Sequence, residues 1–129
     1  MPLSRQAVEI IAAMRTLTGR GPLVFPSTRH AHHVMSENAI GYLLNRAGYH
    51  GRHVPHGWRA TFSSAMNETF RSDRHVIDLM LAHAPKDKTE AAYNRALHMD
   101  RRRELAQMWA DTLLDSAVDV LEIISGRRR

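Results

Sequence analysis

Apolar residues recur along most of this chain at the three- to four-residue spacing that is typical of amphipathic helices. The first helix is expected to begin after Ser4, a good N-cap, and to run to about Leu17, with Ile10 and Met14 on its apolar face. No stretch shows sustained alternation of apolar and polar residues, so strands are expected to be scarce. The pattern predicts a mainly α fold, with at most a short extended segment near residues 23–26.

Start and stop signals divide the rest of the chain into five more helices. The expected ranges are 36–48, 55–69, 73–81, 90–96 and 100–124. Ser36 is placed to cap the first of these, Pro55 to be the first residue of the next, and Ser72 or Asp73 to cap the third. Residues 28–35 are expected to form a loop.

The composition favours one intracellular domain. The 129 residues suit a single domain, expected over 1–129 with a disordered tail at 127–129. The absence of cysteine excludes disulfides, thiolate catalysis and cysteine-based zinc sites. The apolar runs are far shorter than the ~20 residues of a membrane span, and the start of the chain lacks a secretory core. A cytoplasmic protein without a membrane contact is expected.

The excess of positive over negative charge lies entirely in the first half of the chain. Residues 1–60 hold seven Arg and two Glu, whereas residues 61–129 hold equal numbers of acidic and basic residues. Arginine binds phosphate through planar, bidentate contacts. A basic half that is rich in Arg and His therefore suggests nucleic acid as the partner, although a solvated basic surface has the same composition.

Three histidines in the 28–35 loop, His30, His32 and His33, raise the question of a metal site. The loop has no cysteine, and the next carboxylate is that of Glu37. No metal or other cofactor is expected, and a solvated or DNA-facing loop is the simpler interpretation.

Four residues further along form a set with a common chemistry. His56 and Arg59 share one face of the first turn of the 55–69 helix, where backbone N–H groups favour an anion. His83 follows the end of the next helix, and Tyr93 lies ten residues beyond it. Exchange of a phosphodiester needs a nucleophile, cations on the non-bridging oxygens and proton-transfer groups, and these four residues supply each kind.

The segments around these residues resemble three motifs of the tyrosine recombinases, the phage integrase family. Residues 54–63 (VPHGWRATFS) are similar to its His-x-x-Arg box, residues 81–83 (LAH) to its next box, and residues 91–96 (AAYNRA) to its nucleophile segment. Residues 101–111 resemble the tail of prophage-type integrases, and the start of the chain resembles the segment after the family's catalytic hairpin. The resemblance covers essentially the whole chain, as a carboxy-terminal part of the catalytic domain.

The resemblance implies cleavage and rejoining of double-stranded DNA without metal or ATP. Tyr93 would attack the scissile phosphate and form a 3′-phosphotyrosyl link. Arg59 would bind the non-bridging oxygens, His56 would assist proton transfer or donate to the phosphate, and His83 would donate to a phosphate oxygen. Arg52 and His53 precede the 55–69 helix, which holds His56 and Arg59, and are candidates for DNA phosphate contacts.

The family's other catalytic Arg and its hairpin Lys have no counterpart here and are expected upstream of Met1. The chain is thus expected to be a fragment that is inactive alone, exposes apolar surface and self-associates, with a tetramer on DNA for the longer, nucleoid-associated protein. The alternatives are a non-catalytic DNA-binding remnant and an unrelated helical regulator. Trp58, Phe62, Met108 and Trp109 are expected to pack in the core, although the last helix also suits docking on a neighbour.

Overall fold

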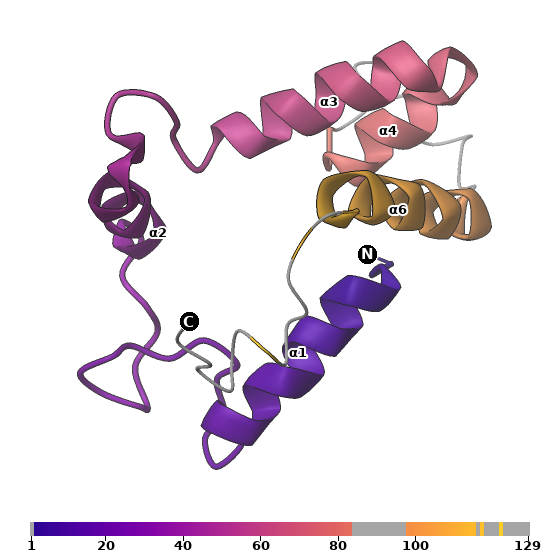
Figure 1. The fold of residues 1–129 in the computed structure, drawn as a ribbon. Helices are drawn as coiled ribbons and strands as arrows, with labels where there is room; N and C mark the ends of the chain where they lie inside the picture. The colour runs from indigo at the N-terminus through magenta and orange to yellow at the C-terminus, as the bar shows by residue number, and fades with distance from the viewer. Residues whose placement is uncertain (1, 84–97, 116, 118–121, 123–129) are drawn as a thin grey trace. The chain divides into compact units, whose positions relative to one another are not determined.

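The computed structural model describes residues 2–83, 98–115, 117 and 122, and these form helices joined by loops (Figure 1). The helices are α1 (Arg5–Thr18), α2 (Ala39–Leu44), α3 (Gly57–Thr69), α4 (Arg74–Met80) and α6 (Met99–Leu114), with a π-helical turn η1 (Asn45–Tyr49) and a 3-10 turn η2 (Arg71–Asp73). Extended pairing in the described residues is one isolated bridge between Pro26 and Val34. The prediction of a mainly α fold is confirmed.

The chain divides into two compact units. Unit 1 contains Met1–Ser4 and His56–Thr112, and unit 2 contains Arg5–Pro55 and Leu113–Arg129. Within the described residues, no helix has the length and apolar character needed to cross a membrane.

Unit 1 has a core at the meeting of α3, α4 and α6 (Figure 1). Val76, Ile77 and Leu105 are fully buried, and Met66 and Leu81 complete the buried cluster. Around it pack the larger side chains Phe62, Phe70, Met80, Met108 and Trp109. Each helix contributes its apolar face, as the spacing of these residues predicts.

The aromatic predictions for this core are partly right. Phe62 meets Trp109 edge to face, with ring centroids 5.4 Å apart, which is a favourable aromatic geometry. Trp58, by contrast, is 50% exposed, so its assignment to the core was wrong. Trp58 is one turn of helix earlier than Phe62, in the first turn of α3, and lies beyond the core cluster.

An ion pair joins the start of α6 to the start of α4. Arg101 donates from Nε and Nη2 to the two carboxylate oxygens of Asp73, at 3.0 and 2.7 Å, and its guanidinium lies 5.8 Å from the Phe70 ring centroid. Asp73 holds the N-cap position of α4, as expected, but makes no side-chain cap bond. The carboxylate is engaged by Arg101 instead, because a bidentate guanidinium contact is stronger than a bond to one backbone N–H.

This ion pair predicts a specific acid sensitivity. The hydrogen bonds from Arg101 hold the pKa of Asp73 below its ordinary value of 3.8. The contribution to stability is therefore complete above pH 3.8 and is lost as the pH falls through the lower pKa of the folded state. We expect the free energy of unfolding of the wild-type chain to fall more steeply below about pH 4 than that of Asp73→Asn, measured by urea unfolding.

Asp100→Asn is the matched control, because its carboxylate pairs with Arg103 at a side chain that is 92% exposed. Such a surface pair contributes little to stability. If Asp73→Asn and Asp100→Asn show the same acid profile as the wild type, the Asp73–Arg101 pair does not stabilise the fold.

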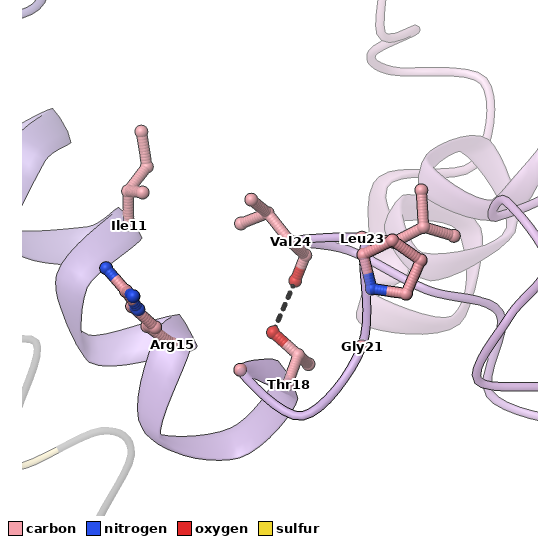
Figure 2. A pocket seen from close by; sticks show the side chains of 8 residues that line it. Ile11, Arg15, Thr18, Gly21, Leu23 and Val24 are labelled. Carbon is pink, nitrogen blue, oxygen red and sulfur yellow. Dashed lines mark hydrogen bonds between the residues drawn. The ribbon is translucent and has the colours of Figure 1, made fainter.

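Unit 2 begins with α1, which starts directly after Ser4 as predicted. At its end, Thr18 Oγ1 donates to the Val24 carbonyl at 2.9 Å and folds the adjoining loop back on the helix (Figure 2). The helix end and this loop line a cavity of about 340 Å³ with Ile11, Arg15 and Leu23. The predicted 28–35 loop is closed by the Pro26–Val34 bridge and by a bond from Ser27 N–H to the His33 carbonyl at 2.8 Å.

Several helix boundaries differ from the predictions because residues near the expected helix ends form turns instead. Ser36 accepts bonds from the N–H groups of Asn38 and Ala39, so it forms a turn, and Asn38 takes the N-cap position of α2. The helix expected from Pro55 begins at Gly57. The helix expected over 100–124 is α6, which ends at Leu114, where Ala117 N–H closes a turn onto the Leu114 carbonyl at 3.1 Å. The expected 90–96 helix and 127–129 tail lie outside the described residues.

Many large apolar side chains of unit 2 are exposed. On α1, Val8 is 52% and Leu17 is 62% exposed, and Val34 in the loop reaches 73%. Exposed apolar patches favour association with other surfaces. The predicted self-association of the chain stays a prediction, and light scattering on the purified chain measures it.

Candidate functional site

The site is built first from the start of α3. His56 holds the N-cap position, makes no side-chain cap bond, and accepts a bond from the Arg59 N–H at 3.1 Å through its backbone carbonyl. Both residues are exposed. The i, i+3 spacing thus places a histidine and an arginine in one helical turn, beside the N–H groups that begin the helix.

The second part of the site is the end of α4, which closes with a Schellman motif. Ala82 N–H bonds to the Leu79 carbonyl at 3.1 Å, and His83 N–H bonds to the Asp78 carbonyl at 3.0 Å. Ala82 has a φ of 54°, in the left-handed region that this motif requires. The chain reverses at this point, so His83 leaves the helix end in a fixed direction.

The two parts are joined by a hydrogen bond from Arg59 to the end of α4. Arg59 Nη2 donates to the carbonyl oxygen of Leu81, the residue at the C-cap position. Carbonyl groups in the last turn of a helix lack partners within the helix and carry its negative dipole, so a guanidinium binds there favourably. The bond uses one part of the guanidinium fork, and the other donors of the fork can bind a phosphate.

The strained backbone of Ala82 gives a testable expectation. A left-handed conformation costs a residue with a Cβ about 1–2 kcal/mol, and the greater freedom of glycine in the unfolded chain offsets about 0.5–1 kcal/mol of that. Ala82→Gly is therefore expected to raise the free energy of unfolding by about 0.5–1 kcal/mol in urea unfolding. Ala65→Gly, in the middle of α3, should lower it by about 1 kcal/mol. A loss of stability in both variants would contradict the role assigned to Ala82.

His83 also contacts α4 through its side chain. Its Nδ1 lies 3.4 Å from Asp78 Oδ1, and the two side chains are 57% and 46% exposed. Arg59 and His83 thus lie together at the end of α4. Arg59 binds the Leu81 carbonyl, and His83 follows directly after Ala82 in the turn.

Three predicted site residues remain, namely Tyr93, Arg52 and His53. Tyr93 lies outside the described residues. Arg52 and His53 belong to unit 2, in a turn where both of their N–H groups bond to the Tyr49 carbonyl, at 3.0 and 3.2 Å. Gly51 has a φ of 69° there, which a glycine adopts without strain. Their predicted contacts with DNA phosphates stay predictions.

The described residues contain no group of three or more His, Asp or Glu side chains placed to hold a metal ion. In the histidine loop, the rings of His30 and His33 lie 5.5 Å apart between centroids. This pair lies in unit 2, whereas His56, Arg59 and His83 lie in unit 1.

Reasoning from the sequence missed two parts of this site. One is the Leu81 carbonyl, because a main-chain acceptor leaves no mark on residue identity. The other is Asp78, whose position five residues before His83 is a usable signal once a Schellman turn is expected between them.

Several curated proteins with similar sequences are named as integrases. The chain is 41% identical over 113 residues to the prophage integrase IntZ of Escherichia coli, a match that covers 88% of this chain and 28% of that protein. It is 38% identical over 128 residues to the prophage integrase IntA of the same species, covering 97% of this chain and 30% of the relative. The integrase of Shigella phage Sf6 is 33% identical over 114 residues, with 88% and 29% covered.

No protein-family model matches the sequence, and no solved structure matches it significantly. The chain spans less than a third of the length of the three integrases named above. The matched regions cover 88–97% of this chain. On these similarities, the chain belongs to the phage integrase, or tyrosine recombinase, family.

Proposed function

We propose that this chain is the carboxy-terminal part of a recombinase catalytic domain that cleaves and rejoins double-stranded DNA at specific sites. The observation that carries the proposal is the hydrogen bond from Arg59 to the Leu81 carbonyl. It ties the His-x-x-Arg turn to the Leu-Ala-His turn, so cationic and proton-donating groups from two segments can act on one phosphate.

In the proposed reaction, the Tyr93 hydroxyl oxygen attacks the scissile phosphorus. The hydroxyl gives up its proton as a bond forms between this oxygen and phosphorus. The bond from phosphorus to the 5′ oxygen breaks, and the 5′ oxygen takes up a proton and leaves as a hydroxyl. The DNA is left joined to Tyr93 through its 3′ phosphate. Attack by a 5′-hydroxyl reverses these steps, and the bond energy is conserved, so ATP is not needed.

The residues at the end of α4 and the start of α3 would stabilise the charge that develops on the phosphate. Arg59 is held by the Leu81 carbonyl before DNA arrives, so its remaining donors are preorganised for the non-bridging oxygens. His83 donates to a phosphate oxygen, and His56, at the N-cap of α3, assists proton transfer or donates to the phosphate. Arg52 and His53 would contact phosphates outside the scissile position.

The test is a covalent capture experiment in a longer protein. This chain replaces the matching segment of the Escherichia coli prophage integrase IntZ, with which it shares 41% identity. The chimera is incubated with a recombination-site duplex that carries a nick near the cleavage point. After cleavage, the short fragment with the 5′-hydroxyl diffuses away and rejoining is prevented. Protein–DNA adducts are then separated under denaturing conditions.

We expect an adduct whose DNA-bearing peptide, identified by mass spectrometry, contains Tyr93. A chimera that binds the duplex and forms no adduct, while intact IntZ forms one, would favour a non-catalytic DNA-binding remnant. The isolated 129-residue chain should form little or no adduct.

A further inference from the structure

A carboxylate stands beside one of the proposed phosphate-binding groups. We propose that Asp78 is a positioning residue, which fixes the ring of His83 so that the opposite ring nitrogen can donate to the DNA phosphate. The inference rests on the role proposed above for His83. Its direct observation is the contact of His83 Nδ1 with Asp78 Oδ1 at 3.4 Å.

The backbone brings these two side chains together. In the Schellman motif at the end of α4, Asp78 occupies the third position from the helix end and His83 the second position after the cap. The bond from His83 N–H to the Asp78 carbonyl, 3.0 Å long, joins these two residues directly. Side chains at these two positions commonly touch in this motif, because the left-handed residue between them reverses the chain. Here that residue is Ala82, and the contact is polar.

Stability alone does not account for Asp78. A carboxylate in the last turn of a helix lies at the negative end of the helix dipole, where it is unfavourable. The side chains of the pair are 57% and 46% exposed, and ion pairs with such exposure contribute little to folding. Asp78 is therefore in a position that disfavours a negative charge, next to a residue with a proposed function.

The chemistry of the contact explains what the carboxylate does. An ionised carboxylate only accepts hydrogen bonds, so the facing Nδ1 of His83 must carry a proton. This bond limits rotation of the ring and fixes the direction of Nε2. A ring that also donates from Nε2 to a phosphate is an imidazolium, and the Asp78 carboxylate offsets its positive charge. The distance of 3.4 Å is long for a hydrogen bond, and such contacts often shorten when the substrate binds.

The experiment measures the rate of adduct formation by the IntZ chimera at saturating DNA. Asp78→Asn is expected to lower this rate by about 10-fold, with DNA affinity unchanged within about 2-fold. Asp78→Glu, which keeps the carboxylate, should recover part of the rate. Glu68→Gln is the matched control, since it removes a carboxylate from the last turn of α3, and it should leave the rate unchanged.

The double variant separates positioning from a structural role. His83→Ala should lower the rate at least as much as Asp78→Asn does, and adding Asp78→Asn to His83→Ala should cause no further loss. Two results would overturn the role of Asp78 and leave the proposed function intact. One is a rate loss in the double variant equal to the product of the losses in the two single variants. The other is a normal rate in Asp78→Asn together with a low rate in His83→Ala. A normal rate in His83→Ala would refute the role of His83 and this inference with it, while the adduct itself would leave the proposed DNA cleavage standing. No adduct from the unmodified chimera would refute the proposed function.

Discussion

Tyr93→Phe is expected to abolish adduct formation by the chimera while DNA affinity stays within about 2-fold of the unmodified chimera. The phenylalanine ring keeps the shape of the tyrosine but has no hydroxyl oxygen to attack phosphorus, so the covalent step has no nucleophile. Adducts are counted after denaturing electrophoresis with a labelled duplex, and affinity is measured by fluorescence anisotropy with the same duplex.

Tyr49→Phe gives the matched control for this change. Tyr49 ends the π-helical turn η1 in unit 2 and is 48% exposed, so loss of its hydroxyl should leave adduct formation unchanged. An adduct that persists in Tyr93→Phe would mean that another residue attacks the phosphate. Loss of DNA binding in the same variant would mean that Tyr93 holds the DNA rather than cleaving it.

Arg59→Lys is expected to lower the rate of adduct formation by about 100- to 1000-fold, even though the charge is kept. A guanidinium can donate to the Leu81 carbonyl and still present a planar pair of donors to a phosphate. An ammonium group has no such fork, so it must leave either the carbonyl or one phosphate oxygen without its donor. Single-turnover kinetics at saturating DNA measure this loss separately from binding.

Arg103→Lys makes the same change on the outer surface of α6, where Arg103 pairs with the exposed Asp100. That variant should react at the normal rate. If Arg59→Lys also stays within about 3-fold of the unmodified chimera, the fork geometry is not used in catalysis and the role given to Arg59 is wrong.

The features that sequence reasoning located well are those set by nearest neighbours along the chain. The start of α1 after Ser4 agrees with the preference of serine for the N-cap position, and the buried positions of α6 agree with helical spacing. The boundary of α2 could not be placed so well, because Ser36 can cap a helix or form a turn with equal ease, and Asn38 offers a second cap.

The site was predictable as a set of residues and not as a geometry. The order of His56, Arg59 and His83 in their motifs is visible in the sequence. Their connection depends on a main-chain oxygen at Leu81 and on a left-handed alanine at position 82, where glycine is the usual residue. Neither is encoded by the type of one residue. The bond to the Leu81 oxygen depends on how α3 packs against α4, and the left-handed alanine depends on the turn that closes α4.

The Arg59–Leu81 bond has a consequence for how such a protein tolerates mutation. The acceptor is a backbone oxygen, which every amino acid supplies, so no substitution at position 81 deletes it directly. Position 81 can therefore vary among apolar residues that fill the core while the arginine keeps its anchor. Substitutions around Arg59 are therefore limited by the need to keep the backbone conformation at the end of α4, and not by the identity of a partner side chain.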